Sequence, residues 1–540
     1  MNVLKCILCF LLAGLTSAFA QPRTGGIPHL QRQGAATQLI VDGKPFLMLG
    51  GELSNSSASS LSYMAPVWPR LAAQNLNTVL TPVSWELIEP QEGRYDFALV
   101  DGLLDAARSN GLKLVLLWFG SWKNTYSSYV PEWVKRDTER FPRVLLKDGR
   151  PTERLTPLNA ANRDADARAY AALMKHLGQV DTHRTVLMIQ VENEIGVIPE
   201  SRDFSPAANA AFNSPVPPAL LDYVRANGDR LEPELHDAWV GAGSRTGGTW
   251  PEVFGTAPIV DDFFMAWHYA AYLDVIVAAG KAAYNLPMFT NAALIRPNYQ
   301  PGQYNSGGPL PHSMDIYRAG APHLDFISPD IYFTNFAYWA GRYRRDGNPV
   351  FVPETFGDAG GAANAYYAFG QLDAIGFSPF GIDRTPPAPA SARSPLADAY
   401  ATLAHLAPEI TKHQGSDRLT GIVLEGSEQR NGRISFGGYD ITVNWAGAPG
   451  AQETNRRIGI LFIHTGEDEF LIAGSGAATL SFAPATVGRQ TAGIASIDEE
   501  ILLDGQWLRQ RRLNGDENGQ GQVLRLGVGA AVYKVRLYKY

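Results

Sequence analysis

Eight short apolar segments, most of them separated by helix-like stretches, lie within the first 385 residues of this 540-residue chain. They are PFLMLGGE (45–52), NTVLTPVSW (77–85), KLVLLWFG (113–120), TVLMIQVE (185–192), PMFTNAA (287–293), FISPDIYF (326–333), PVFVPETF (349–356) and GFSPFGI (376–382). Between them, runs such as 96–110 and 163–180 have apolar residues at helical spacing. Strands that alternate with helices in this way predict a parallel sheet covered by helices.

Eight strand–helix units over roughly 350 residues match the count and size of a (β/α)8 barrel with insertions. A doubly wound open sheet is the alternative. The one candidate dinucleotide loop, GAGSRTGG (241–248), does not follow a strand and lacks the G-x-G-x-x-G spacing. The sequence therefore favours an α/β fold with a (β/α)8 TIM barrel.

The rest of the chain predicts an insertion and a second domain. Residues 198–262 are rich in Pro, Gly, Asn and Asp and are interpreted as a long loop insertion within a barrel that spans 21–395. Residues 384–395 predict a connection and 396–414 a helix. From 417 onward, short alternating strands separated by Gly, Asn and Asp predict an all-β, sandwich-like domain, so that 396–540 is a connecting helix and a β-domain packed on the barrel.

The first twenty residues have the features of a secretory signal peptide. One charge, Lys5, precedes the apolar run CILCFLLAGLTSAFA, and AFA (18–20) is a small-x-small cleavage site before Gln21. Both cysteines, Cys6 and Cys9, lie in this segment, so the mature chain is expected to hold no thiol and no disulfide. With no second apolar run of that length apparent, we expect an exported protein, periplasmic or secreted by a bacterium, without membrane insertion after cleavage.

Composition excludes some partners. A net charge of −7 and the lack of a Lys/Arg-rich run argue against nucleic-acid binding. The sequence has no HExxH or EF-hand motif, and its one CxxC, at Cys6 and Cys9, lies in the expected signal peptide, so no metal and no other cofactor is expected. Nothing in the sequence indicates the oligomeric state.

Acidic residues follow two of the predicted strands, where barrel enzymes carry their catalytic groups. In LMIQVENEIG (187–196), Glu192, Asn193 and Glu194 end a strongly apolar run, and FVPETFGD ends in the same way with Glu354. If the chain stays extended, Glu192 and Glu194 share one face. For Glu192 a structural role is favoured.

Further polar and aromatic candidates stand at the ends of other predicted strands: Glu52, Trp85, Trp122, Lys123 and Tyr332. Two carboxylates that meet in a Trp-lined mouth suit glycoside hydrolysis. That reaction needs one protonated acid for the leaving oxygen, and one ionised group that acts as nucleophile or activates water.

IQVENEIG and PETFG, 160 residues apart, resemble the acid/base and nucleophile segments of glycoside hydrolase family 35, the retaining β-galactosidases. They belong to a clan of (β/α)8 glycosidases with a catalytic Glu after strands four and seven. PVSWELIEPQEGRYDF (82–97) is similar to the family's strand-two segment, and the C-terminal region resembles a β-domain appended to a bacterial subgroup.

The resemblance implies that Glu194 is the acid/base and Glu354 the nucleophile. Asn193 would bind the sugar 2-hydroxyl, and Tyr332 would hydrogen bond to the nucleophile. The sequence departs from the family after strand three, where WFGSWKN (118–124) stands in place of the Cys-Ala-Glu-Trp segment of the animal-type members. Substrate contacts are therefore expected from Glu52, Trp85, Trp122 and Lys123 as well.

The expected function is that of an exported, retaining exo-β-galactosidase. It would remove terminal β-galactosyl residues from plant cell-wall oligo- or polysaccharides such as galactosylated xyloglucan fragments, without a cofactor. Another β-glycosidase of the clan, such as a β-mannosidase or an endo-β-glycanase, is the nearest alternative. A non-catalytic carbohydrate-binding protein on the same fold is the alternative from a different class.

Overall fold

A computed structural model describes residues 26–384, 394–426, 429–446, 457–486, 488, 490–503, 505–527 and 531–540. The expected signal peptide (1–20) lies outside the described residues, as does nearly all of the connection expected at 384–395.

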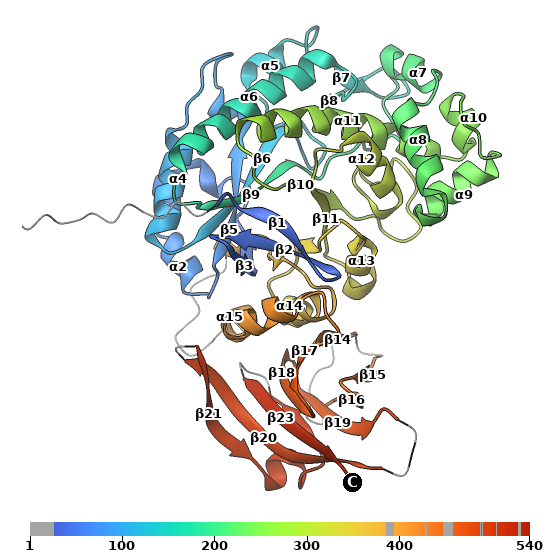
Figure 1. Cartoon of the computed structure of the whole chain (residues 1–540). Coiled ribbons are helices and arrows are strands. Elements are labelled where there is room, and N and C mark those ends of the chain that lie inside the picture. The colour runs from blue at the N-terminus through green and yellow to red at the C-terminus, as the bar shows by residue number, and fades with distance from the viewer. Residues whose placement is uncertain are drawn as a thin grey trace, which may run out of the picture.

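Eight parallel strands form the central barrel (Figure 1). They are β4 (Met48–Glu52), β5 (Thr78–Ser84), β6 (Lys113–Lys123), β9 (Val186–Asn193), β10 (Met288–Ala293), β11 (Phe326–Asp330), β12 (Phe351–Val352) and β13 (Gly376–Phe377). Each corresponds to one of the eight predicted segments. The hydrogen-bonded order is β11-β10-β9-β6-β5-β4-β13-β12. The Ile331 N–H closes the remaining gap by donating to the Glu354 carbonyl at 2.9 Å. The predicted (β/α)8 barrel is confirmed.

The strand interiors are buried because helices cover the outside of the barrel and side chains fill the inside. The longer covering helices are α4 (Ala98–Ser109), α6 (Ala160–Val180), α11 (Ile259–Ala283), α13 (Phe336–Tyr343) and α14 (Ala359–Gln371). Shorter helices are α1 (Leu61–Met64), α2 (Trp68–Ala72), α3 (Trp85–Ile88), α5 (Glu132–Arg136) and α12 (Met314–Gly320). Inside the barrel, Met48, Leu117 and Phe289 pack in one cluster with Leu39 and Val41. The last two belong to β2 (Ala36–Val41), which forms a small antiparallel sheet with β1 (His29–Gln33) and β3 (Lys44–Phe46).

Helix α11 is a second long apolar segment, which was not recognised from the sequence. By length and composition it could cross a membrane, and it is the one helix with these properties in the described part of the chain. Its apolar residues, such as Phe263, Met265 and Leu273, are fully buried in the large core. Since it lies in the helical layer of the barrel, packed against α6 and α12, its apolar character is that of a core helix.

The segment 198–262 is not an unstructured loop. It contains four helices: α7 (Pro206–Phe212), α8 (Pro218–Asn227), α9 (Pro233–Gly241) and α10 (Trp250–Phe254). Each has proline in its first turn. Proline fits there because the first N–H groups of a helix have no intrahelical partner and its fixed φ suits the helix. Four of the prolines that suggested a loop, Pro206, Pro218, Pro233 and Pro251, thus lie where helices start.

The C-terminal region is an antiparallel sandwich, as predicted. Helix α15 (Pro395–His413) leads into it. One sheet has the order β14 (Leu419–Glu425), β17 (Arg457–Gly466), β18 (Glu469–Ser475), β23 (Val532–Lys539), β20 (Ala492–Leu503), β21 (Gln506–Leu513). The other has the order β15 (Asn431–Phe436), β16 (Tyr439–Trp445), β19 (Ala478–Pro484), β22 (Leu524–Leu526).

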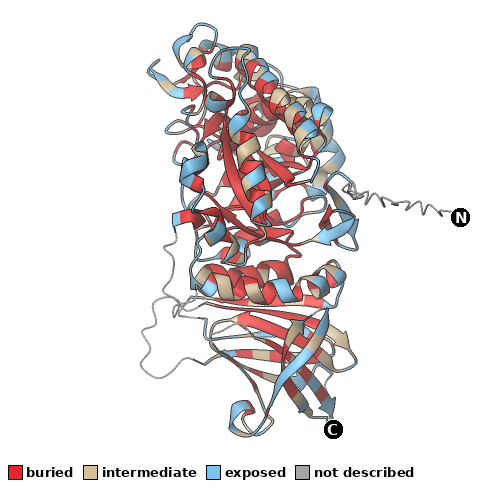
Figure 2. Cartoon of the chain, turned by 90° about the vertical axis from the view of Figure 1, so that its left-hand side faces the viewer, coloured by how far each residue is buried: buried red, intermediate tan, exposed pale blue. Residues whose placement is uncertain are grey.

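Strand β17 joins the two regions because both of its faces are buried. Ile460 and Phe462 point into the sandwich core, whereas Leu461 and Ile463 belong to the same apolar cluster as the barrel helices. This alternation follows from the two-residue period of a strand. Helices α14 and α15 lie between the barrel and the sandwich (Figure 1), and Figure 2 shows that this helical layer has buried residues along it.

At this junction, Gly459 of β17 has no room for a side chain. A Cβ atom there would lie 1.8 Å from the Ala363 carbonyl oxygen of α14. We expect Gly459→Ala to lower the free energy of unfolding by about 2 kcal/mol, because two backbones must separate. Differential scanning calorimetry would measure the lower melting temperature. Gly527→Ala is the matched control, since no atom lies within 4 Å of its Cβ position. Equal melting temperatures of the two variants would contradict the close contact.

Candidate active site

The two acids that end β9 point to different places. Glu192 and Glu194 have positive φ values of 62° and 46°, so the chain is not extended at either residue. The expectation that they share a face is therefore wrong. Asn193 lies between them and is fully buried.

Glu192 supports the backbone of the neighbouring strand β6. One of its oxygens accepts the Ser121 N–H at 2.9 Å and the other the Trp122 N–H at 2.7 Å. Burial, followed by the adjacent Asp166 carboxylate, raises the pKa of Glu192 well above its usual value. Its contacts are structural, in keeping with the reading from the sequence.

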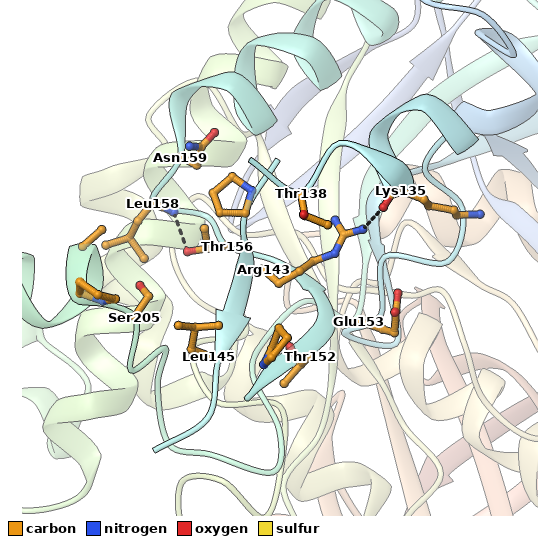
Figure 3. Close-up of a pocket in the computed structure, with 14 residues that line it drawn as sticks. Lys135, Thr138, Arg143, Leu145, Thr152, Glu153, Thr156, Leu158, Asn159 and Ser205 are labelled. Carbon is orange, nitrogen blue, oxygen red and sulfur yellow. Dashed lines mark hydrogen bonds between the residues drawn. The ribbon is translucent and has the colours of Figure 1, made fainter. Parts of the chain in front are cut away.

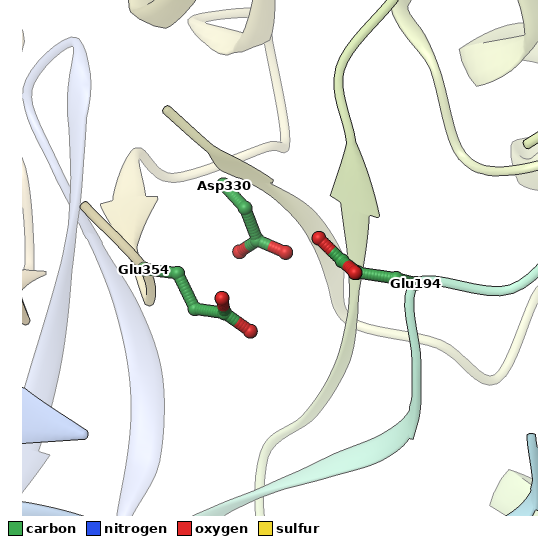
Figure 4. Close-up of side chains that lie close together, drawn as sticks. All are labelled: Glu194, Asp330 and Glu354. Atoms are coloured by element: carbon green, nitrogen blue, oxygen red, sulfur yellow. The ribbon is translucent and has the colours of Figure 1, made fainter. Parts of the chain in front are cut away.

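Glu194 faces two other carboxyl groups (Figure 4). One carboxylate oxygen from each of Glu194, Asp330 and Glu354 lies within 4.8 Å of the others. They follow or end β9, β11 and β12, three strands that lie far apart in the sequence and meet at one end of the barrel. Side chains at the carboxyl ends of barrel strands converge in this way because all eight strands run in the same direction.

Two donors hold the Glu354 carboxylate, one on each oxygen. The Asn193 amide donates to Oε1 at 3.2 Å, and the Tyr332 hydroxyl donates to Oε2 at 2.9 Å. Tyr332 also packs edge-on against Phe356, with ring centroids 5.0 Å apart. Both contacts fix the direction in which Glu354 presents its oxygens.

Glu194 is the acid whose proton affinity is most relevant to chemistry near neutral pH. Burial, and then the charge of Glu354, raise its pKa to about 7, while the Lys123 ammonium opposes this rise. The backbone N–H of Glu194 donates to Asn291 at 2.9 Å, and its carbonyl accepts from Asn305 at 2.9 Å. A buried acid next to an ionised one is the arrangement that holds two carboxyl groups in different protonation states.

Lys123 supplies the positive charge of the site. Its ammonium donates to Oδ1 of the Asn193 side chain at 2.8 Å. Burial alone would lower the pKa of Lys123, but the Glu354 and Glu194 carboxylates raise it above its usual value. Lys123 thus holds the Asn193 amide that contacts Glu354 and also interacts with the charges of the clustered carboxylates.

Glu52 ends β4 and is fully buried, and neither of its oxygens has a hydrogen-bond partner among the described residues. Burial, followed by the charge of Glu354, raises its pKa well above the usual value. A neutral carboxyl group with two free oxygens can exchange hydrogen bonds with a hydroxyl group of a ligand.

Asp330 was not recognised from the sequence. It accepts a hydrogen bond from Asn291 at 2.7 Å, and burial, then the Glu354 charge, raise its pKa well above the usual value. The signal was present in FISPDIYF, where Asp330 precedes Tyr332 by two residues at the end of a strand. Aspartate also ends ordinary strands, so position alone did not single it out.

The sequence predicted that Trp85 and Trp122 contact the substrate, but the structure does not bring them to the site. Both indole rings are fully buried in the large core. Trp85 donates to Glu89 at 2.8 Å, and Trp122 donates to the Leu155 carbonyl at 3.1 Å. Neither ring has an exposed face on which a sugar could stack, because the covering helices and loops enclose them.

The three clustered carboxylates offer oxygen ligands of the kind that a divalent cation takes. The Lys123 ammonium interacts electrostatically with all three. Lys123 therefore supplies a positive charge beside the three carboxylates, as a bound cation would.

A separate cavity of about 650 Å³ lies around the hairpin of β7 (Arg143–Leu145) and β8 (Pro151–Leu155). Figure 3 shows Arg143 across this cavity, with its guanidinium donating to the Lys135 carbonyl at 3.1 Å. None of the predicted site residues lines it. The cavity is therefore distinct from the carboxylate cluster.

Comparison with known families is consistent with the barrel and its acids. Residues 69–261 match the family model of glycoside hydrolase family 42, described as "Beta-galactosidase", and 396–525 match "Domain of unknown function (DUF5597)". A β-galactosidase of Xanthomonas manihotis is 28% identical over 202 residues, which cover 36% of this chain. The matched part is 31% of that protein, so this chain spans about a third of that relative's length.

Solved structures with a similar fold include the β-galactosidase of Bacillus circulans sp. alkalophilus, with a TM-score of 0.48 and 12% identity. That match covers 91% of this chain and 99% of the other. The β-galactosidase of the psychrophilic Marinomonas ef1 has a TM-score of 0.45 and 14% identity, covering 68% of this chain and 60% of that one.

Residues 69–261 of the barrel are thus similar to glycoside hydrolases. The family whose model matches is not family 35, to which the sequence motifs were compared. Those motifs follow strands four and seven, and a Glu at these places is common to the clan, so they do not separate its families. The matched segment includes Asn193 and Glu194 and ends before Glu354.

The raised pKa of Glu194 predicts a pH-dependent stability. Between its usual value of 4.5 and about 7, the folded state binds a proton that the unfolded state has released. Its contribution to stability therefore falls as pH rises through this window. We expect Glu194→Gln, which stays neutral, to raise the free energy of unfolding by ~3 kcal/mol at pH 8 and not at pH 4.

Urea unfolding at the two pH values would measure this difference. Glu132→Gln is the control, because the Glu132 side chain is 71% exposed. A gain that is the same at pH 4 and pH 8 would contradict the raised pKa.

Proposed function

We propose that the protein is a retaining exo-β-galactosidase that acts by double displacement. The observation that carries this proposal is the pair Glu194 and Glu354, with oxygens within 4.8 Å of each other, together with the pKa of about 7 for Glu194. Retaining glycosidases have their two carboxyl groups about 5–5.5 Å apart, whereas inverting enzymes leave about 6.5–9.5 Å for a water molecule.

In the first step, Glu354 attacks the anomeric carbon and the bond to the leaving oxygen breaks. Glu194 donates its proton to that oxygen. Asn193, which contacts Glu354, is proposed to bind the sugar 2-hydroxyl, an interaction that strengthens in the transition state. Glu52 and Lys123 are proposed ligands of the other hydroxyl groups.

In the second step, water attacks the anomeric carbon of the glycosyl–enzyme and Glu194 accepts its proton. Esterification removes the charge of Glu354, which after burial is the largest cause of the raised pKa of Glu194. The pKa of Glu194 therefore falls when the intermediate forms. The same side chain can then act as a base.

The proposed substrates are galactosylated oligo- or polysaccharides of plant cell walls, such as xyloglucan fragments, and the enzyme is proposed to be exported. The similarity to the Xanthomonas manihotis β-galactosidase supports the choice of galactose. The apolar segment before Gln21 supports export.

A panel of aryl β-glycosides and galactosylated oligosaccharides tests the substrate. We expect turnover of β-galactosides, with β-galactose as the first product, and kcat/KM that declines above about pH 7 as Glu194 loses its proton. Turnover of β-mannosides alone would assign another glycosidase of the clan. Binding without turnover would assign a carbohydrate-binding protein.

The two acids should fail differently when replaced. We expect Glu354→Gln to lower kcat by about 10⁴-fold or more on every substrate. Glu194→Ala should still form the intermediate from glycosides with good leaving groups, then stall, at a cost of about 10²–10⁴-fold. Added azide, which needs no base, should release β-galactosyl azide from Glu194→Ala. Formation of the α-azide by Glu194→Ala and of the β-azide by Glu354→Ala would exchange the roles of the two residues, and no rescue of Glu194→Ala by azide would contradict its assignment as acid/base.

A further inference from the structure

The loop that carries Tyr332 is held by the C-terminal β-domain. After β11, residues 331–335 run to the start of α13, and Thr334 and Asn335 are exposed. On the barrel side, Ile331 donates to the Glu354 carbonyl, and the Tyr332 hydroxyl donates to the Glu354 carboxylate. The far end of the loop has its contacts in the other domain.

Arg457, the first residue of β17, binds the carbonyl groups that follow Tyr332. Its Nη2 donates to the Thr334 oxygen at 2.7 Å and to the Phe333 oxygen at 3.4 Å. Its Nη1 donates to the Asn364 side chain of α14 at 3.0 Å. One guanidinium therefore joins the Tyr332 loop to the helix that follows Glu354 along the chain.

Glu425, the last residue of β14, binds the other end of the same loop. Its Oε1 accepts the backbone N–H of Ala337 at 3.0 Å, in the first turn of α13. The side chain of the residue before this helix, Asn335, makes no capping hydrogen bond. A carboxylate from the β-domain thus takes the place of a local cap, where it also meets the positive end of the helix.

The two side chains act together because they are neighbours across the sheet. Glu425 and Arg457 are directly paired in the register of β14 and β17. The Arg457 charge also counteracts the effect of burial, which raises the pKa of Glu425. The close contact of β17 with α14 at Gly459 fixes the distance between this pair and the barrel.

We propose that Glu425 and Arg457 are positioning residues for the active site, and that holding the Tyr332 loop is a function of the β-domain. Neither residue touches the reacting carboxylates. They act through the loop backbone on Tyr332, and through Tyr332 on the direction of Glu354. The effect on catalysis rests on the function proposed above, whereas the effect on the loop does not.

Hydrogen–deuterium exchange of the full-length protein tests the structural part without any substrate. In Arg457→Met, we expect the loop and the first turn of α13, including the Ile331 and Ala337 amides, to exchange about tenfold faster. This factor corresponds to the loss of one charge-assisted hydrogen bond. The strands of the barrel should exchange as in the wild type. Arg512→Met is the matched control, because Arg512 binds Asp498 within the β-domain at 2.7 and 2.8 Å.

Kinetics on an aryl β-galactoside tests the catalytic part. We expect Arg457→Met to lower kcat about tenfold with little change in KM, because the reacting group loses its orientation. In a Tyr332→Phe background, which already lacks the bond to Glu354, Arg457→Met should have little further effect. Glu425→Gln, which keeps an oxygen acceptor, should retain most of the activity that Glu425→Leu loses. If Arg457→Met does not fold, Arg457→Lys replaces it in both experiments.

Unchanged exchange in residues 331–337 overturns the proposal, whatever the activity. A second outcome is faster exchange while Arg457→Met lowers kcat by the same factor in the wild type and in Tyr332→Phe. That result overturns the proposal that the pair acts on Glu354 through Tyr332. A wild-type protein that turns over no glycoside, yet shows the faster loop exchange in the variant, contradicts the proposed function and leaves the role of the pair in holding the loop supported.

Discussion

Four buried carboxyl groups and one ammonium share the mouth of the barrel, and their mutual electrostatics constrain the rest of the site. Water would screen such charges from one another, but Glu52, Asp330 and Glu354 are almost completely buried. Burial raises the pKa of Glu52, Glu194 and Asp330, and the neighbouring charges add to that effect. The site can persist only because a rigid framework holds groups together that would otherwise move apart or collect protons.

That framework is the closed ring of parallel strands. The bond from Ile331 to the Glu354 carbonyl closes the ring at the position where the clustered carboxyl groups begin. The hydrogen bond that closes the ring of strands therefore also fixes the backbone of Glu354 in the site. A shift of one strand would displace Glu354 from both of its donors, Asn193 and Tyr332.

The β-domain is part of this framework. Strand β17 contributes to the sandwich core on one face and to the barrel core on the other, so neither region has a complete apolar core without it. The same strand begins with Arg457, which reaches the loop behind Tyr332. The close packing of β17 on α14 at Gly459 thus lies two residues from the hydrogen bonds that Arg457 makes.

The sequence by itself determined the elements and the two principal acids. Eight apolar segments specify eight strands, because a strand buried on both faces must be apolar throughout. Glu194 and Glu354 stand out since an acid directly after such a segment lies at a barrel rim. The alternating pattern after residue 417 determined the sandwich in the same way, through its two-residue period.

Only the tertiary structure decided which side chains meet. Asp330 joins the cluster because β11 lies between β10 and β12 in the closed ring and its carboxyl end meets those of β9 and β12, an arrangement that no local pattern contains. Trp85 and Trp122 are removed from the mouth because helices and loops distant in sequence enclose them. The positive φ at Glu192 and Glu194 separates two acids that the extended chain would place together. Local periodicity determines which face of an element is buried, whereas contacts between distant segments depend on how the elements pack, and this packing determines the chemistry of the site.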